Sequence, residues 1–519
     1  MFKPENFKGK KALVIGAGKS GIACANLLAG QGFAVLLTEQ KKAAEIKDRL
    51  KTVSRLVKVE AGGHTPAVLT CGFAVKSPGL PQSSPLIKSL LKRKIPVFSE
   101  IETALAFSAG KLLAVTGTNG KTTTVRLIAH LLSGSGLTTG MTCTDGVYVN
   151  DRRLDSGDCS GPKSARNVLM HPDVDAAVFE TARGGLLREG LAFDRCKVAV
   201  VTNIGEGDHL GLNYITTVED LAVLKRVIVQ NVAPDGMAVL NAADPIVARM
   251  AENCPGAVTY FAADRHHPVM ATHNAQGKRV VYIDGNHIVC AELGSVVQRI
   301  PLADVPLTRK GTIGFQVDNA MASVAAAWAL NLDWAAVRAA LRSFASDAET
   351  APGRFNVFSY RGATLIADYG HNPDAILALV RAVEAMPAER RMMVISGAGD
   401  RRDEDIRKQS EILGDAFDEV ILYQDQCQRG RADGEVLALL REGLKQAKRA
   451  KAVEEIRGEF LAIDTALARI QPGELCLILI DQVEEALAHI ANRLAEVSID
   501  RSKAAMQAGA PPQKKAATA

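Results

Sequence analysis

A short glycine-rich segment carries the residue types that hold the phosphates of a nucleotide. Gly117-Thr118-Asn119-Gly120-Lys121-Thr122-Thr123 follows the apolar run Lys111–Val115 and opens a helix-like stretch. A glycine turn at a helix N-terminus presents backbone N–H groups and a positive partial charge to an anion. Lys121 is placed to reach the outer phosphates, and the Thr122 hydroxyl to hold Mg²⁺. Only two residues separate Gly117 from Gly120, so the segment departs from Gly-x4-Gly-Lys-[Ser/Thr], and an ordinary helix-capping turn is the alternative.

Charged or metal-binding residue types also follow two predicted strands in the same region. Glu180 is the last residue of the apolar segment Val178-Phe179-Glu180, and Asp208-His209 come after the next apolar segment, Val198–Thr202. Glu and His beside a triphosphate are suitable ligands for a hard divalent ion. The residues alone leave open that His209 is an ordinary surface histidine.

The seven-residue glycine segment resembles the ATP loop of the Mur ligase family. These enzymes activate a carboxylate as an acyl phosphate and join it to an amine. The resemblance implies that Gly117–Thr123 bind ATP, and that Thr122, Glu180 and His209 hold magnesium. Lys225, on a predicted helix, matches the lysine that Mur ligases carbamylate to make a further metal ligand, although a solvated helix lysine is the alternative. The predicted catalytic set is Lys121, Glu180, His209 and Lys225.

Polar residues also follow predicted strands in the last third of the chain. Pro352-Gly353-Arg354-Phe355 precedes Asp368-Tyr369-Gly370-His371-Asn372-Pro373, in which Asp and His lie between a strand and a helix. Such residues suit a site at the carboxyl edge of a sheet. In Mur ligases and folylpolyglutamate synthases, the matching Arg and Asp face ATP and the His-Asn-Pro turn faces the incoming amino acid. The resemblance therefore assigns Arg354 and Asp368 to ATP, and His371 and Asn372 to the amine. Asn319 matches the asparagine that meets adenine, with Phe315-Gln316 in place of the usual His-Asn.

The middle and last parts of the chain resemble the amino-acid-adding, Mur-type half of cyanophycin synthetase. The likeness runs from about residue 111 to 490 and is most specific over Glu180–Arg195. That half ligates arginine to the side-chain carboxylates of a polyaspartate backbone. We expect Arg183 and Arg188 to grip a carboxylate-bearing acceptor, although surface salt bridges explain them equally well. Asp400 and Arg401 would bind a zwitterionic amino acid, and a solvated helix start is the alternative.

The first hundred residues carry a different signal. Gly16-x-Gly18-x-x-Gly21, with Glu39 after the next strand, reads superficially as a dinucleotide fingerprint. The segments 62–64, 76–81 and 99–102 instead resemble the N-terminal domain of UDP-N-acetylmuramoyl-L-alanine–D-glutamate ligase. The resemblance implies that Gly16, Gly18, Gly21 and Glu39 bind the nucleotide part of the acceptor. Cyanophycin synthetase has no such domain in this position, and we expect the chain to lack that enzyme's ATP-grasp half.

The elements that position these residues alternate between strand-like and helix-like runs. Lys11–Ile15, a helical run through Leu28 and Ala34–Thr38 form a βαβ pattern, which is typical of a parallel sheet. We predict an α/β protein of three domains: a Rossmann-like N-terminal domain, a P-loop central ATPase domain and a Rossmann-like C-terminal domain. Their expected bounds are 1–108, 109–346 and 347–498, followed by a disordered tail at 499–519.

Composition limits the classes of function. The net charge is +5, and four basic residues lie in the last nineteen, so the body is nearly neutral. A nucleic-acid reader usually carries its basic excess on the folded domain. No apolar run approaches the roughly 20 residues that span a membrane. The nine cysteines are scattered without a Cys-x-x-Cys pair, which favours reduced thiols and a cytoplasmic protein.

We therefore expect an ATP- and Mg²⁺-dependent carboxylate–amine ligase, similar to cyanophycin synthetase, that adds an amino acid to a small-molecule or peptide acceptor. The alternative within the family is UDP-N-acetylmuramoyl-L-alanine–D-glutamate ligase of peptidoglycan synthesis. An NAD-dependent oxidoreductase depends on residues 16–39 alone, and a catalytically silent scaffold is a further alternative. The amine, the acceptor and the oligomeric state are left open, and neither nucleic acid nor membrane is an expected partner.

Overall fold

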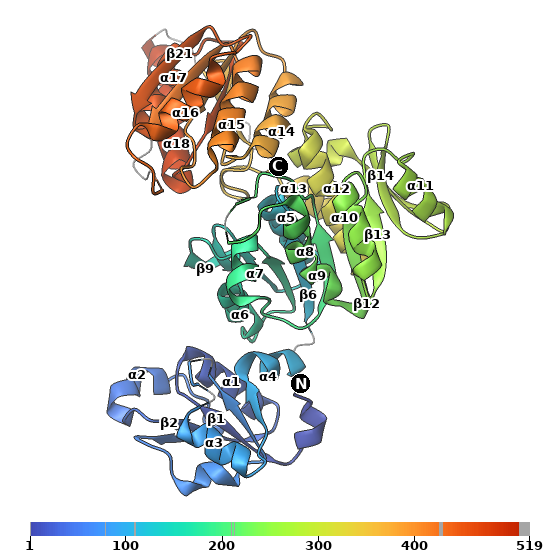
Figure 1. The fold of residues 1–519 in the computed structure, drawn as a ribbon, viewed down its shortest axis with the longest axis vertical. Coiled ribbons are helices and arrows are strands. Elements are labelled where there is room, and N and C mark those ends of the chain that lie inside the picture. Colours follow the sequence, from blue (N-terminus) through green and yellow to red (C-terminus); the bar gives the residue numbers. More distant parts are fainter. Residues whose placement is uncertain are drawn as a thin grey trace.

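The chain folds into three α/β domains, as predicted, each built on its own sheet (Figure 1). The structure is a computed structural model that describes residues 2–77, 79–81, 83–107, 110–208, 210–211, 213–424 and 429–507. The first domain lies on the opposite side of the central domain from the third (Figure 1). The boundaries at residues 109 and 347 remain predictions.

The first domain has a five-stranded, fully parallel sheet in the order β3-β2-β1-β4-β5. Its strands are β1 (Lys11–Ile15), β2 (Ala34–Glu39), β3 (Val57–Ala61), β4 (Phe73–Lys76) and β5 (Val97–Ser99). Its helices are η1 (Pro4–Phe7), α1 (Lys19–Gly30), η2 (Ala43–Ile46), α2 (Lys47–Leu50), η3 (Pro66–Thr70), α3 (Pro85–Lys92) and α4 (Glu100–Phe107). The glycine turn that follows β1 lies at the point where the strand order reverses, which is the usual ligand-binding edge of such sheets.

The central domain has an eleven-stranded sheet in the order β16-β15-β14-β13-β12-β11-β6-β10-β7-β8-β9. Its middle strands are parallel, and antiparallel hairpins extend it at both edges. The strands are β6 (Lys111–Thr116), β7 (Thr139–Cys143), β8 (Gly146–Val149), β9 (Arg152–Ser156), β10 (Ala176–Glu180), β11 (Cys196–Val201), β12 (Val232–Asn241), β13 (Ala257–Phe261), β14 (Val280–Asp284), β15 (His287–Glu292) and β16 (Ser295–Pro301). The helices are α5 (Lys121–Gly134), α6 (Pro162–Leu169), α7 (Arg183–Glu189), α8 (Val218–Lys225), α9 (Val227–Gln230), α10 (Pro245–Arg249), η4 (Met250–Asn253), α11 (Pro268–Ala275), η5 (Leu302–Asp304), η6 (Pro306–Thr308), α12 (Gly314–Ala329) and α13 (Trp334–Ser343).

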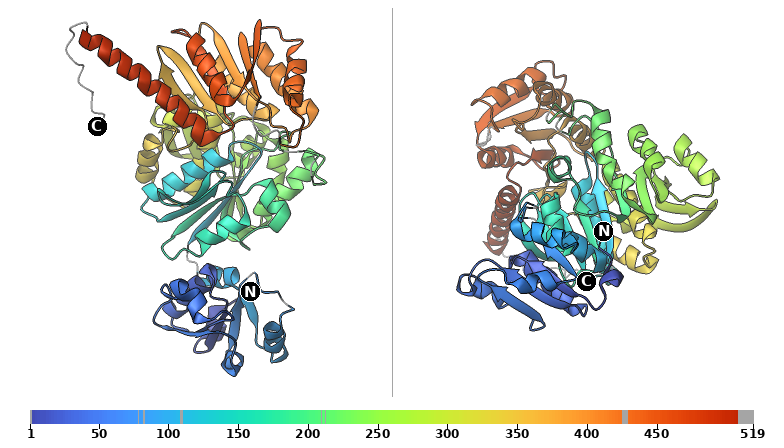
Figure 2. Two further views of the ribbon diagram at one scale, coloured as in Figure 1. Left: turned by 90° about the vertical axis from the view of Figure 1, so that its left-hand side faces the viewer. Right: turned by 60° about the horizontal axis from the view of Figure 1, so that its bottom comes forward.

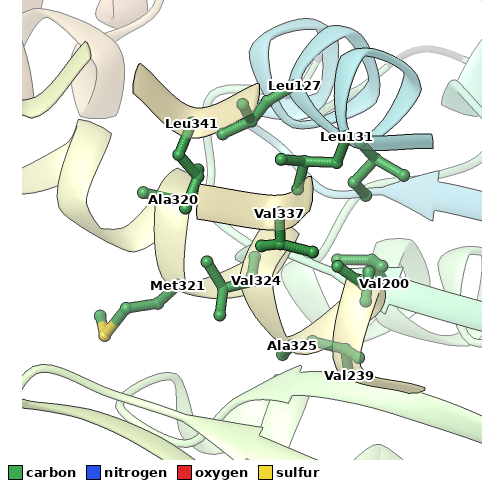
Figure 3. Close-up of a cluster of buried hydrophobic side chains, with 14 of the residues drawn as sticks. Leu127, Leu131, Val200, Val239, Ala320, Met321, Val324, Ala325, Val337 and Leu341 are labelled. Carbon is green, nitrogen blue, oxygen red and sulfur yellow. The ribbon is translucent and has the colours of Figure 1, made fainter. Parts of the chain in front are cut away.

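Helices α5, α12 and α13 pack together against one face of the central sheet (Figure 3). The contact combines leucines of α5 with small residues of α12, which let the helices approach the strands closely. The labelled side chains are Leu127, Leu131, Val200, Val239, Ala320, Met321, Val324, Ala325, Val337 and Leu341. Burial of this many apolar side chains fixes α5 and α12 to the sheet, so the N-termini of both helices are held rigidly beside the carboxyl ends of the strands.

The third domain has a six-stranded sheet in the order β17-β18-β22-β19-β20-β21, parallel except for the pair β17–β18. Its strands are β17 (Asn356–Tyr360), β18 (Ala363–Asp368), β19 (Arg391–Ile395), β20 (Glu419–Gln424), β21 (Ala452–Arg457) and β22 (Leu475–Leu479). Its helices are α14 (Pro373–Glu384), α15 (Asp403–Ala416), α16 (Glu435–Leu444), α17 (Glu459–Arg469) and α18 (Val483–Gln507).

Helix α18 corrects the prediction that disorder begins at residue 499. The helix continues to Gln507, and its C-terminal end extends away from the body of the protein (Figure 2). Six of the nine residues added, 499–507, are Arg, Lys, Ala, Met or Gln, which are good helix formers, and extending an existing helix requires no new nucleus. Residues 508–519 lie outside the described residues. No helix in the described ranges is both long and apolar enough to cross a membrane.

Candidate active site

Three neighbouring parallel strands bring the predicted site residues to one edge of the central sheet. Glu180, the last residue of β10, pairs with Val115 of β6, and Val201 of β11 pairs with Thr116 of β6. The phosphate loop, the Glu180 carboxylate and the segment after β11 therefore emerge side by side. A cavity of about 640 Å³ opens at this edge, and its wall includes residues of both the central and the third domain.

The phosphate loop needs its two glycines. Gly117 and Gly120 have φ angles of +154° and +80°, which residues with side chains rarely adopt. A Cβ on Gly117 would lie 2.0 Å from Thr202 Oγ1, and one on Gly120 would lie 2.3 Å from Asn319 Oδ1. The loop is thus wedged between the ends of β11 and α12, with its backbone close to both.

The segment after β11 holds the loop in shape. The Thr118 N–H donates to the Asn203 carbonyl, and the Asn119 N–H donates to Asn203 Oδ1, both at 2.8 Å. The Gly205 N–H donates to Thr118 Oγ1 at 2.9 Å. Lys121 Nζ donates to the Thr118 carbonyl at 2.9 Å, so the lysine side chain folds back onto the loop. These bonds fix the shape of the loop, and its role in binding phosphates remains a prediction.

Glu180 is the centre of an oxygen-rich cluster on the floor of the cavity. Its carboxylate is 3 % exposed and accepts hydrogen bonds from Thr122 Oγ1 at 2.9 Å and from the Thr144 N–H at 3.2 Å. Burial raises the pKa of Glu180, and the positive charges of Lys121 and Arg354 act in the opposite direction. A carboxylate beside two hydroxyls is the donor set that Mg²⁺ takes, so these residues fit the predicted metal.

Lys225 lies beneath the phosphate loop. Its side chain is fully buried, and its Nζ donates to the Gly117 carbonyl and forms an ion pair with Asp208. Burial lowers the pKa of Lys225 to about 8, and Asp208 acts in the opposite direction. His209, the other predicted metal ligand on this side, lies outside the described residues. Within the described part of the chain, no three His, Cys, Asp or Glu side chains gather as a ready-made metal site.

Arg354 reaches from the third domain into the phosphate site. Its Nη2 donates to Thr122 Oγ1 at 3.3 Å and to Thr144 Oγ1 at 3.2 Å. Asp368, 8 % exposed, accepts the N–H groups of Phe355 at 2.7 Å and Gly370 at 2.6 Å. Burial raises the pKa of Asp368 to about 6, against the effect of Arg354. Both residues line the cavity, where the sequence predicted them to face ATP.

The His-Asn-Pro turn also lines the cavity. Asn372 is the N-cap of α14, where its Oδ1 accepts the Ala375 N–H at 2.9 Å. Its Nδ2 donates to Asn119 Oδ1 at 2.9 Å, so it contacts the phosphate loop directly. His371 Nδ1 hydrogen-bonds to the Tyr369 carbonyl at 2.6 Å, and the two rings meet edge to face at 4.4 Å. Contact of either residue with an amine remains a prediction.

The four charged residues predicted to bind substrates line the same cavity: Arg183, Arg188, Asp400 and Arg401. Arg401 Nη1 donates to the Gly207 carbonyl at 2.8 Å, which ties the third domain to the segment after β11. Asp400 pairs with Arg429 at 3.5 Å. The substrate roles of the four residues remain predictions.

The first-domain residues lie elsewhere, because Gly16, Gly18, Gly21 and Glu39 are absent from the wall of this cavity. Glu39 Oε2 accepts the Ala17 N–H at 2.7 Å and therefore fastens the glycine turn to the end of β2. Burial acts to raise the pKa of Glu39, but hydrogen bonds from backbone N–H groups hold it below the usual value. The assignment of these residues to the acceptor remains a prediction.

Several residues at the site were not predicted as site residues. Thr144 directly follows β7, Asn203 and Asp208 belong to the segment after β11, and Asp318 lies on α12 beside Asn319. For the first three, the available signal was their place after the carboxyl end of a parallel strand. Asp318 has no such signal, because it becomes part of the cavity only through the packing of α12.

Comparisons with known proteins agree with this geometry. Residues 10–99 match the Mur ligase MurD-like N-terminal domain, residues 115–327 the Mur ligase middle domain, and residues 353–479 the Mur ligase glutamate ligase domain. A UDP-N-acetylmuramoylalanine–D-glutamate ligase of Chlorobium phaeobacteroides is 30 % identical over 474 residues, which cover 90 % of this chain and 93 % of that protein. The chain belongs to the Mur ligase family.

The family consists of ATP-dependent acid–amino-acid ligases, so the predicted enzyme class is confirmed at the level of the family. A cyanophycin synthetase of Geminocystis herdmanii is 41 % identical over 381 residues, which cover 73 % of this chain and 43 % of that protein. This Mur ligase thus spans less than half the length of that relative. A pseudomurein peptide ligase type C from Methanothermus fervidus shares the fold, with a TM-score of 0.57 and 19 % identity over 93 % of this chain and 100 % of that one.

Proposed function

We propose that this Mur ligase forms an amide bond between an amino acid and a carboxylate acceptor, through an acyl phosphate made from ATP, as a cyanophycin-synthetase-like ligase. The observation that carries the proposal is the meeting of Lys121, Glu180 and Arg354 at one cavity. Two of these residues come from the central domain and one from the third. A site shared between domains is suited to bring two reactants together and exclude water when they have bound.

The chain's own groups account for the first chemical step. The N–H groups of Gly120–Thr123, at the start of α5, hold the phosphates, because those of Thr118 and Asn119 already donate to Asn203. Lys121 exchanges the Thr118 carbonyl for a phosphate oxygen. An acceptor carboxylate oxygen attacks the γ-phosphorus, the bond to the β–γ bridging oxygen breaks, and ADP leaves with that electron pair. Arg354, which already contacts Thr122 and Thr144, offsets the charge that develops on the transferred group.

The second step joins the amine. The amine nitrogen attacks the acyl carbon, loses a proton, and inorganic phosphate leaves with the electrons of the broken C–O bond. Mg²⁺ held by Thr122, Glu180, His209 and Lys225 would screen the phosphate charges and so reduce repulsion of the attacking carboxylate. Arg183 and Arg188 would hold the acceptor, and His371, Asp400 and Arg401 the amino acid.

Lys225 would enter this metal site as a carbamate. Its amine nitrogen would add to the carbon of CO₂ and lose a proton, for which Asp208 is the adjacent acceptor. Two features support this assignment: Nζ lies directly beneath the Gly117 carbonyl of the phosphate loop, and the side chain is fully buried. A buried ammonium near bound Mg²⁺ would repel the metal, whereas a carbamate supplies an oxygen ligand.

A second candidate is UDP-N-acetylmuramoylalanine–D-glutamate ligase. It is favoured by the first domain, which matches the MurD-like N-terminal domain and extends the similarity to 93 % of one such relative. In both candidates we assign acceptor binding to the first domain, with Gly16, Gly18, Gly21 and Glu39 at the glycine turn.

The experiment that tests the proposal measures phosphate release from ATP for each amino acid, with aspartate-rich peptides or UDP-muramoyl-alanine as acceptors. We expect release that requires both an amino acid and a peptide acceptor, with an amide product of the corresponding mass. Release only with UDP-muramoyl-alanine and D-glutamate would favour the second candidate. Absence of nucleotide binding would overturn both.

A further inference from the structure

Part of the cavity wall is apolar and comes from β13, α12 and α14. Phe261 at the end of β13 and Phe315 on α12 form part of its wall, together with Ala378 and Leu379 of α14. Helix α12 also lies against the phosphate loop. A Cβ added to Gly120 of the loop would be 2.3 Å from Oδ1 of Asn319 on the helix. Aromatic and aliphatic walls beside a phosphate site suit the planar base of a nucleotide.

Asn319, the residue that the sequence assigned to adenine, is already bonded within the protein. Its Nδ2 donates to Gln316 Oε1 at 2.9 Å, and its Oδ1 accepts from Thr124 Oγ1 at 3.4 Å. The side chain is 5 % exposed. The bond to Thr124 holds α12 against α5, and the two bonds together leave Asn319 one N–H for a ligand.

Asp318, the preceding residue, differs from Asn319 because its side chain has no bonding partner within the described part of the protein. It lines the cavity and is half-buried, and no hydrogen bond or ion pair joins its carboxyl group to any residue in the described ranges. It lies three positions after Phe315 on the same helix, so the two side chains project from adjacent parts of one face. Withdrawing a carboxyl group even partly from water, without a protein partner, is costly unless a ligand supplies one.

We propose that Asp318 selects the nucleotide base by accepting a hydrogen bond from the 6-amino group of adenine. The inference rests on the proposed function, because it takes ATP as the substrate. Guanine carries a carbonyl oxygen at position 6, which is a hydrogen-bond acceptor. It would face the acceptor oxygen of Asp318, and no hydrogen bond could form between the two.

The protonation state of the carboxyl group favours the same base. Burial raises the pKa of Asp318 to about 7. A carboxyl group that is partly protonated at neutral pH can accept from the adenine amino group with one oxygen and donate to a ring nitrogen with the other. Guanine would instead offer its N1–H and 2-amino groups, which bind best to an ionised carboxylate.

The test compares calorimetric dissociation constants of ATP, GTP and purine riboside triphosphate, which is ATP without the 6-amino group. We expect the parent protein to bind ATP about tenfold more tightly than the other two nucleotides. Asp318→Ala should lower the affinity for ATP to that for purine riboside triphosphate, whose own affinity should fall less, because that nucleotide loses only the bond to its ring nitrogen. Asp318→Asn retains an acceptor and should keep part of the preference.

Asp158→Asn is the matched control, because Asp158 is another carboxylate of the cavity wall, on the segment that follows β9. Its ratio of ATP to purine riboside triphosphate affinity should equal that of the parent. A parent ratio near one, an unchanged ratio in Asp318→Ala, or tighter binding of GTP than of ATP would overturn the role of Asp318 while leaving the ligase proposal standing. If the parent binds none of the three nucleotides, the ligase proposal itself fails.

Discussion

Asn119 of the phosphate loop and Asn372 at the start of α14 are joined by a pair of side-chain hydrogen bonds. Asn372 Nδ2 donates to Asn119 Oδ1 at 2.9 Å, and Asn119 Nδ2 donates to Asn372 Oδ1 at 3.4 Å. The residues are 253 positions apart and belong to different domains. The pair therefore couples the shape of the ATP loop to the position of the third domain, which also contributes Arg354 to the site.

Asn372→Asp should separate this coupling from helix capping. Aspartate can still accept the Ala375 N–H at the start of α14, but it cannot donate to Asn119 Oδ1. We expect turnover to fall about tenfold with little loss of stability, whereas Asn372→Ala should also lose about 1 kcal/mol of stability with the cap. Turnover at saturating substrates measures the loss of coupling, and urea unfolding measures the loss of stability. Parent-like turnover in Asn372→Asp would show that the pair does not couple the domains.

Lys121→Ala should abolish ligation while leaving the fold intact. Among the described residues, Lys121 Nζ hydrogen-bonds to the nearby Thr118 carbonyl alone, so the loss of its side chain costs little structure. Its charge is needed when phosphate charge must be offset in the transition state, and we expect turnover to fall by at least about 100-fold. Steady-state kinetics and thermal unfolding check both halves of this expectation. Turnover within a few-fold of the parent would remove Lys121 from the mechanism.

Lys225→Ala should be largely inactive and partly restored by a short carboxylate such as acetate or propionate. The variant leaves a cavity where the carbamate would lie, beside Asp208 and the Gly117 carbonyl. We also expect the parent, equilibrated with ¹³C-labelled CO₂, to show a carbamate carbon signal by NMR that is absent from Lys225→Ala. Full activity of the variant in bicarbonate-free buffer would exclude the carbamate.

Asp368→Asn should change how stability depends on pH. The pKa of Asp368 is raised from 3.8 to about 6, so between these values the folded protein takes up a proton that the unfolded chain does not. The free energy of unfolding of the parent therefore rises as the pH falls through this window, by up to about 1.4 kcal/mol per pH unit, and the asparagine variant lacks this contribution. Between about pH 7 and about pH 4.5 we expect a shift of about 2 kcal/mol in favour of the parent. Identical pH dependence of urea unfolding in the two proteins would contradict it.

Gly18→Ala should raise the KM for the acceptor and leave the affinity for ATP unchanged. A Cβ on Gly18 meets no atom within 4 Å, and its backbone is extended, so the methyl group fits the protein and projects from the glycine turn. Gly30→Ala is the matched control, since it also adds a methyl group in open space, at the far end of α1. If both variants keep the parent KM, the acceptor does not approach this turn.

Much of the site could be predicted from the sequence because it is local. The glycine segment 117–123 lies between a buried strand and a helix, and both elements are encoded by adjacent residues with clear apolar periodicity. Glu180 could be predicted for the same reason, because it ends an apolar strand, and parallel strands present their carboxyl ends at one edge. The sequence alone thus determined three α/β domains, a nucleotide loop and a carboxylate beside it.

Only the tertiary structure decided what these residues contact. The pairing of Asn119 with Asn372, and the reach of Arg354 to Thr122, depend on how the third domain packs on the central one. The helical pattern of α12 did not reveal that Asn319 would hydrogen-bond to Gln316 and Thr124. Nor did it reveal that Asp318 would face the cavity, because the position of a helix against its neighbours is set by the summed packing of distant apolar side chains.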